Sequence, residues 1–258
     1  MITISVAPHA TYTCSPETLK ASKKLADKLG LPLQIHVSET GKEVTDVTSR
    51  YGATPVNHLD NLGFFGGTVI AAHVVHPTPQ EISLLATRKV GVAHNPESNM
   101  KLASGVAPVT DMLKAGVMIG LGTDGAASNN NLNIFKEMNA AAKLQKVARL
   151  DPTAMNSRET VAAATIGGAR VLGLAKQTGS LEQGKKADLI IIDLQRPHLV
   201  PLYNVYSHLV YAVSASDVRT VLVDGRILLE EGKFLTLDEK TIMQEVADLA
   251  LKIKESQR

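Results

Sequence analysis

The sequence predicts an α/β protein in which a parallel β-sheet is followed by a smaller β-rich region. Three observations lead to this fold class. Short β-branched runs alternate with longer amphipathic segments, the runs are apolar on both faces, and the alternation stops near residue 174. Strands that alternate with helices form parallel sheets, whose strands are covered on both faces. We therefore place βα units at 1–174 and a β-rich domain with a closing helix at 175–258.

The first region contains the repeated strand–helix units. A helix is expected at 16–29, because Ser15 is a suitable N-cap, Pro16 suits the first helical position and Gly30 suits the end. The strands are expected at 2–7, 33–37, 68–74, 90–94 and 117–122.

The later elements change in character. Two helical patterns occupy 131–150 and 157–173, and strands are expected at 185–193 and 218–234. Asp224-Gly225 divides the last of these into a hairpin, because this dipeptide suits a tight turn between strands. A final amphipathic helix is expected at about 238–255, with strand-forming residues before it.

Composition excludes several classes of protein. The 258 residues carry a net charge of +2 and only 3% aromatic residues, so there is neither a basic stripe nor a stacking platform for nucleic acid. One cysteine cannot form a disulfide within the chain. No apolar run approaches the roughly 20 residues of a membrane span, and the first residues lack the basic start of a signal peptide. We expect a cytoplasmic protein that binds neither nucleic acid nor a membrane.

Ionisable side chains follow the predicted strands. Imidazole and carboxylate groups suit Zn²⁺ or Fe²⁺, and the carboxyl ends of parallel strands meet at one edge, so a metal-dependent hydrolase is the natural hypothesis. Glu39 lies close behind one such end and suits proton transfer. Taken singly, each histidine is more commonly a hydrogen-bonded structural residue. The residues at the strand ends are His9, His36, His73, His94 and Asp124.

Other chemistries lack their motifs. Cytidine-type zinc deaminases need two cysteines as ligands, and this chain has one. Cys14 is not part of a nucleophile elbow, and we interpret it as a small packed side chain. The glycine-rich segment at 122–128 lacks the lysine and the spacing of a phosphate-binding loop.

Five longer motifs carry a resemblance to a known family. They are VAPHATYTCS at 6–15, QIHVSET at 34–40, AAHVVHP at 71–77, AHNPESNMKLASGVAPV at 93–109 and GLGTDGAASNNNLN at 120–133. Together they resemble the amidohydrolase superfamily, and within it the 5-methylthioadenosine/S-adenosylhomocysteine deaminases. The resemblance implies about strands 4 to 8 of a (β/α)8 metallo-dependent hydrolase barrel, followed by part of a composite β-sandwich.

The resemblance also implies a metal site. His36 and Asp124 match metal ligands of the family, and His73, at a neighbouring strand end, is the third candidate ligand. One divalent ion is implied, zinc in the first place and iron as the alternative. We interpret Asn95 as a structural residue that fixes the turn at Pro96.

The implied reaction is the hydrolytic deamination of an adenosine-type thioether nucleoside to an inosine derivative and ammonia. Asp124 is expected to take a proton from the attacking water, and Glu39 to protonate the purine ring. His73 is expected to orient the attacked centre. His9, Glu39, Asp124 and Ser128 are expected to contact the substrate.

One departure from the family is as informative as the match. The family takes two further ligands from an H-x-H motif, and no H-x-H occurs in these 258 residues. We therefore expect the C-terminal portion of a deaminase, with around 90 barrel residues missing at about 30 residues per strand–helix unit. Such a chain is expected to bind metal weakly, to be nearly inactive alone, and to form a homo-oligomer or associate with the missing N-terminal segment.

Alternatives remain open at this stage. The chain could act on another heterocycle, of the guanine, cytosine or triazine type, or be a truncated non-catalytic paralogue that serves as a structural subunit. The sequence does not separate a methylthio from a homocysteinyl substrate.

Overall fold

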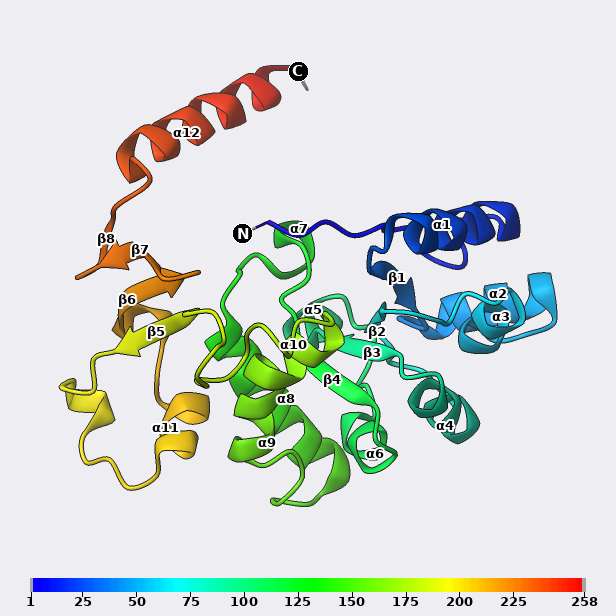
Figure 1. The fold of residues 1–258 in the computed structure, drawn as a ribbon, viewed down its shortest axis with the longest axis horizontal. Coiled ribbons are helices and arrows are strands. Elements are labelled where there is room, and N and C mark those ends of the chain that lie inside the picture. Colours follow the sequence, from blue (N-terminus) through cyan, green and yellow to red (C-terminus); the bar gives the residue numbers. More distant parts are fainter. Residues whose placement is uncertain (1, 257–258) are drawn as a thin grey trace.

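A computed structural model of the chain describes residues 2–256 and contains two four-stranded sheets (Figure 1). The first is parallel, in the order β1-β2-β3-β4, and the second is antiparallel, in the order β5-β6-β7-β8. The predicted α/β class is therefore confirmed. The first sheet consists of β1 (Leu33–Val37), β2 (Val69–His73), β3 (Gly91–His94) and β4 (Met118–Leu121).

One face of the parallel sheet packs on the main core. A row of register partners, Ile35, Ala71, Val92 and Ile119, crosses all four strands, and each of them is buried in this core. The helices that contribute to it include α1 (Pro16–Leu29), α3 (Pro55–Asn61), α4 (Pro79–Thr87) and α6 (Val109–Lys114), with α2 (Gly41–Tyr51) beside α3.

The opposite face carries small side chains. The row of partners that starts at His36 continues through Ala72, Ala93 and Gly120. These residues leave space on this face near the carboxyl ends of the strands. Helix α10 (Gly168–Val171) covers part of the same face, since a Cβ atom added at Gly120 would lie 2.9 Å from the Cα atom of Gly168. Both faces of the sheet are thus partly covered, as the apolar strands predicted.

The predicted strand at 2–7 is wrong. The segment runs parallel to β1, but only two isolated bridges form, Val6 with Leu33 and Ala10 with His36. The reason is Pro8, which has no N–H group to donate to β1 and therefore interrupts the ladder. The parallel sheet has four strands, and this segment accompanies its edge.

Two local signals in the sequence are confirmed by the structure. The side chain of Ser15 accepts a hydrogen bond from the Thr18 N–H at the start of α1, and Gly30 ends the helix with φ of 63°. The Asp224-Gly225 turn joins β6 (Val218–Val223) to β7 (Arg226–Glu230), with which β8 (Lys233–Phe234) pairs. These features depend on a few adjacent residues, and tertiary packing does not override them.

The helix expected at 157–173 is interrupted. Helix α9 (Ser157–Ala162) is followed by a π-helical turn at Ala163–Gly167 and then by α10. A Cβ atom added at Gly167 would approach the Ile119 carbonyl oxygen to 2.4 Å. The glycines therefore permit close backbone contact between this helical segment and β4.

The remaining elements complete the chain. The helix expected at 131–150 is α8 (Ile134–Arg149), and it is preceded by the short helices α5 (Pro96–Lys101) and α7 (Ala126–Asn129). The strand expected at 185–193 is limited to β5 (Leu189–Ile192), and α11 (Val205–Tyr211) packs on α8 through Val210 and Met138. Figure 1 shows α12 (Glu239–Ser256) extending away from the rest of the chain, and none of its residues is buried. The division at residue 174 stays a prediction.

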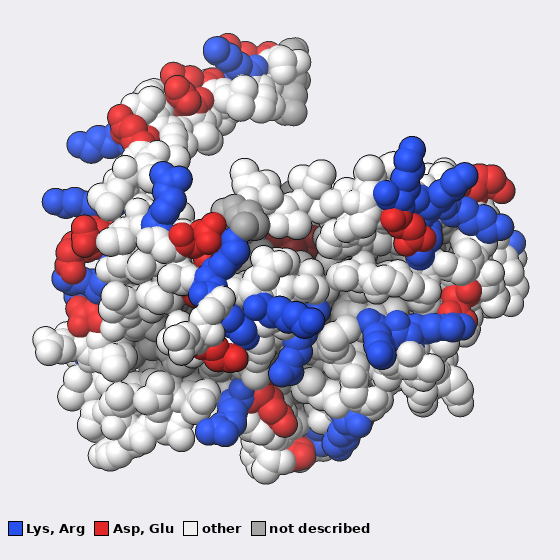
Figure 2. Space-filling view, viewed as in Figure 1, with Lys and Arg blue, Asp and Glu red and all other residues white. Residues whose placement is uncertain are grey.

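The face drawn in Figure 2 carries charged side chains of both signs. Lys and Arg side chains lie among Asp and Glu side chains on the face in Figure 2, and no continuous basic stripe crosses that face. Within residues 2–256, every helix is too short or too polar to cross a membrane.

We predict that Gly120→Ala destabilises the fold by about 1–3 kcal/mol, because its methyl group would overlap the backbone at Gly168. Gly41→Ala is the matched control, since nothing lies within 4 Å of a Cβ atom added there, and we expect a change within about 0.5 kcal/mol. Urea denaturation of both variants measures the difference. Equal stability of the two variants would contradict the packing of α10 against β4.

Candidate metal and catalytic site

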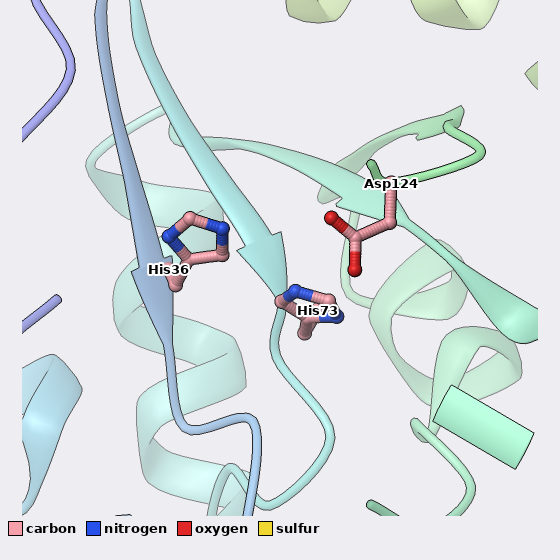
Figure 3. Close-up of side chains that lie close together, drawn as sticks. All are labelled: His36, His73 and Asp124. Atoms are coloured by element: carbon pink, nitrogen blue, oxygen red, sulfur yellow. The ribbon is translucent and has the colours of Figure 1, made fainter. Parts of the chain in front are cut away.

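Three potential metal ligands meet at the carboxyl edge of the parallel sheet. They are His36 on β1, His73 at the end of β2 and Asp124 in the loop after β4, and Figure 3 shows the three side chains pointing toward one another. One ligand atom from each lies within 4.8 Å of those of the other two. The sequence predicted this convergence, because parallel strands end at one edge.

The backbone at two of these residues is unusual. His73 has φ of 72° and Asp124 has φ of 60°, and a bulky residue rarely adopts this left-handed conformation. The register partner of His73 is Val37, which is buried in the core. Regular alternation would place His73 on that core face, but the positive φ ends the alternation, and its ring stacks on the ring of His36 at a centroid distance of 5.5 Å.

The ring of His36 is oriented by a backbone carbonyl. Its Nδ1 atom lies 2.6 Å from the carbonyl oxygen of His9, which also accepts from the His36 backbone N–H at 3.0 Å. A carbonyl only accepts, so Nδ1–H is the donor and Nε2 keeps its lone pair. The imidazole of His9 is exposed, and its Nδ1 atom lies 2.7 Å from Thr13 Oγ1.

Asp124 is held as a carboxylate. Its Oδ2 atom accepts a hydrogen bond from the Ser98 hydroxyl at 2.7 Å, and its Oδ1 atom accepts from the Gly125 N–H at 2.7 Å. Partial burial works to raise the pKa of Asp124, but these hydrogen bonds and the nearby His73 and His36 lower it overall. Asp124 therefore stays ionised and able to bind a cation.

Glu39 lies beside the three ligands. Its Oε2 atom is 3.9 Å from Nε2 of His73, and its Oε1 atom accepts from the Ser104 hydroxyl at 3.2 Å. The backbone around Glu39 is held by Glu43 on α2, whose carboxylate accepts from the N–H groups of Ser38 and Glu39 at 3.1 and 2.7 Å. This carboxylate fixes the turn that presents Glu39.

The carboxylate of Glu43 is itself buried. Burial raises the pKa of Glu43, and the hydrogen bonds from the Glu39 N–H, the Thr11 hydroxyl and the Ser38 N–H oppose that rise. Sequence reasoning missed this residue. Its signal was Thr40 followed three residues later by Glu43, a spacing typical of a helix start.

A second buried glutamate supports the loop that carries Asp124. Glu137 on α8 is fully buried, and it accepts hydrogen bonds from the Asn129 side chain at 2.6 Å and from the Glu97 N–H at 3.2 Å. Asn129 also donates to the carbonyl oxygen of Thr123 at 2.8 Å. Burial raises the pKa of Glu137 to about 7. The loop after β4 is thereby tied to both α5 and α8.

One strand-end residue, His94, does not lie where the sequence suggested. His94 is two residues beyond Val92 and therefore shares its core face, where the ring is fully buried. Burial and the neighbouring His73 lower the pKa of His94 to about 3, and neither ring nitrogen has a hydrogen-bond partner among residues 2–256. His94 lies outside the ligand cluster.

The interpretation of Asn95 as the residue that fixes the Pro96 turn is wrong. Its side chain makes no capping hydrogen bond to α5, and its Nδ2 atom lies 3.4 Å from Nδ1 of His73. Ser128, expected to contact substrate, lies half-buried on α7, outside the three-ligand cluster.

Comparison with known proteins assigns the family. The sequence model described as "Amidohydrolase family" matches residues 1–228. The chain belongs to the amidohydrolase family. This amidohydrolase is 50% identical to the 5-methylthioadenosine/S-adenosylhomocysteine deaminase of Syntrophobacter fumaroxidans over 254 residues, which are 98% of this chain and 58% of that protein.

Two further comparisons point the same way. The amidohydrolase is 51% identical to the 5'-deoxyadenosine deaminase of Methanothermobacter thermautotrophicus over 243 residues, 94% of this chain and 56% of that protein. It superimposes on a crystal structure of an adenosine deaminase from Xanthomonas campestris with bound zinc, with a TM-score of 0.95 and 39% identity over 97% of this chain and 57% of that one. The chain thus spans between half and two thirds of the length of these relatives.

We predict that Glu43→Ala accelerates amide hydrogen exchange at Ser38 and Glu39, because their N–H groups lose their acceptor. The matched control is Glu81→Ala. Glu81 has the corresponding position in α4 and accepts from the Thr78 N–H at 2.8 Å. Both variants are expected to lose about 1–3 kcal/mol of stability. Unchanged exchange at Ser38 and Glu39 in Glu43→Ala would show that the Glu43 carboxylate does not hold the turn that presents Glu39.

We predict a pH-dependent stability difference between the wild type and Glu137→Gln. The folded pKa of about 7 lies above the ordinary value of 4.5, so the folded chain binds more protons between these pH values and loses stability as pH rises through them. Relative to Glu137→Gln, the wild type should lose at most about 3.5 kcal/mol across this window, at roughly 1.4 kcal/mol per pKa unit. Urea denaturation at several pH values measures it, with exposed Glu245→Gln as the control. A flat difference would place the pKa of Glu137 near its ordinary value.

Proposed function

We propose that this chain supplies half of the active site of a zinc-dependent deaminase that acts on adenosine-type thioether nucleosides, S-adenosylhomocysteine or 5-methylthioadenosine. The observation that carries the proposal is the cluster of His36, His73 and Asp124 with Glu39 beside it. Relatives that are about 50% identical bear deaminase names, which supports the nucleoside substrate. Since the chain spans 58% of such a relative, the activity is proposed for the complete protein.

The residues fit a zinc ion. Two imidazoles and a carboxylate are a donor set that suits zinc, and the lone pair of His36 Nε2 is left free by the hydrogen bond at Nδ1. Asp124 is ionised because its pKa is lowered. When bound, the metal lowers the pKa of a coordinated water and so supplies the nucleophile.

The side chains divide the proton transfers between them. The overall reaction forms a C–O bond and breaks a C–N bond at C6 of the purine, releases ammonia and involves no oxidation. Asp124 accepts the proton of the attacking water, and Glu39 delivers a proton to ring nitrogen N1. His73 orients the water and the attacked carbon, while His9 and Ser128 contact the nucleoside.

The direct test is an ammonia-release assay on S-adenosylhomocysteine, 5-methylthioadenosine, 5'-deoxyadenosine and adenosine. The complete protein is expected to deaminate at least one of the first two, and Glu39→Gln to abolish turnover while keeping zinc. We expect the 258-residue chain alone to be nearly inactive. Turnover on guanine, cytosine or a triazine, without turnover on the nucleosides, would assign a different substrate. Absence of any turnover would favour a non-catalytic subunit.

We predict that zinc binds the isolated chain weakly and through the proposed ligands. His36→Ala and Asp124→Asn should each raise the zinc dissociation constant about 10-fold or more, because each removes one of few ligands. His208→Ala on α11 is the control and should leave the constant unchanged. Isothermal titration with zinc measures all four proteins. Equal constants would show that zinc binds elsewhere.

The proposed association with a second copy or with a missing segment stays a prediction. It is supported by α12, whose apolar side chains Ile242, Met243 and Val246 are all exposed. Light scattering of the chain tests it, and a monodisperse monomer would count against it.

A further inference from the structure

The ring of His73 is buried, so its orientation depends on neighbouring side chains. Only 1% of the side chain is exposed, which excludes an alternative partner from bulk solvent. Two amide side chains lie near its Nδ1 atom: Asn99 Oδ1 at 2.8 Å and Asn95 Nδ2 at 3.4 Å. Glu39 Oε2 lies near the other nitrogen, at 3.9 Å, which is too far for a hydrogen bond.

The two amides make opposite demands on one nitrogen. The Asn99 oxygen can only accept, so it requires a hydrogen on Nδ1, whereas the Asn95 amide group can only donate and requires a lone pair there. In a neutral imidazole, Nδ1 carries either a hydrogen or a lone pair in the ring plane, so it can satisfy only one of the two amides. The distance from Nδ1 is 2.8 Å to the Asn99 oxygen and 3.4 Å to the Asn95 nitrogen. Because the shorter contact is the stronger hydrogen bond, Asn99 places the hydrogen on Nδ1.

The backbone of Asn99 is firmly placed, and its buried Nδ2 atom has no hydrogen-bond partner among residues 2–256. The residue is fully buried on α5, its backbone N–H donates to the Asn95 carbonyl at 3.0 Å, and its carbonyl accepts from the Ser104 N–H at 2.8 Å. The preceding residue, Ser98, donates to Asp124. Two consecutive residues of one helical turn thus each hold a member of the three-ligand cluster.

We propose that Asn99 is a positioning residue that holds the His73 ring in the tautomer with hydrogen on Nδ1, so that Nε2 presents a lone pair to the site. The His9 carbonyl imposes the same tautomer on His36. Both rings then keep a lone pair on Nε2, which can bind a cation or accept a hydrogen bond from water. The consequence for catalysis rests on the proposed function, but the tautomer does not.

The test is nitrogen NMR of the full chain labelled with ¹⁵N-histidine, without metal, at about pH 8, where an ordinary imidazole is neutral. The signals that disappear in His73→Gln identify His73. We expect its Nδ1 to carry the proton and its Nε2 to show the shift of an unprotonated nitrogen. Protonated Nε2 in the wild type would overturn the proposal on its own.

Two variants separate positioning from folding. Asn99→Leu keeps the branched shape and the number of heavy atoms but removes the acceptor, and we expect His73 to shift to protonated Nε2. Asn99→Asp restores an acceptor and should restore the Nδ1 proton, while Asn95→Ala should leave the tautomer unchanged. An unchanged tautomer in a folded Asn99→Leu chain would refute the role of Asn99.

A second readout is zinc affinity. Asn99→Leu should raise the zinc dissociation constant about 10-fold or more, and Asn99→Asp should recover most of the loss. Deaminase turnover enters none of these measurements. If the protein is inactive but His73 has the expected tautomer, the proposed function fails and this inference stands. If the protein is active but His73 is protonated at Nε2, this inference fails and the proposed function stands.

Discussion

The arrangement of the site depends on one pair of hydrogen bonds from a single helical turn. Helix α5 follows β3, yet its residues Ser98 and Asn99 reach to the loop after β4 and to the end of β2. The edge of a parallel sheet brings side chains near each other, but it does not fix the orientation of their ligand atoms. The hydrogen bonds from α5 fix this orientation, because α5 follows β3 and contacts the ends of both neighbouring strands, β2 and β4.

Buried carboxylates perform the corresponding task for the backbone. Glu43 and Glu137 are both in the first turn of a helix, and each accepts hydrogen bonds from a loop that carries a candidate functional residue. Burying an acid costs free energy, which appears as a raised pKa at both residues. At both loops this cost is offset because the carboxylate accepts hydrogen bonds from donors that would otherwise be unsatisfied. The positions of the site residues therefore depend on these buried hydrogen bonds as well as on apolar packing.

Periodicity and topology made part of the site predictable from the sequence, and the predictions failed where single residues override both. Strand spacing predicted that five strand-end residues would share one edge, and the family resemblance selected His36, His73 and Asp124, which do meet. It did not predict that His94 would face the core, because a strand that is apolar on both faces does not reveal which face packs on the core. The strand expected at 2–7 does not form, because Pro8 lacks the N–H group that would continue the hydrogen-bond ladder. The supports Ser98 and Asn99 were within a recognised motif, but only the structure revealed their partners.

The interruption by Pro8 has a consequence for the site. The segment that contains His9 is held to the edge of β1 by few backbone bonds, yet its carbonyl is the group that orients His36. Without the His9 carbonyl, the His36 ring would lose the acceptor that fixes its tautomer. The orientation of a candidate metal ligand therefore depends on the irregular pairing at the edge of the sheet.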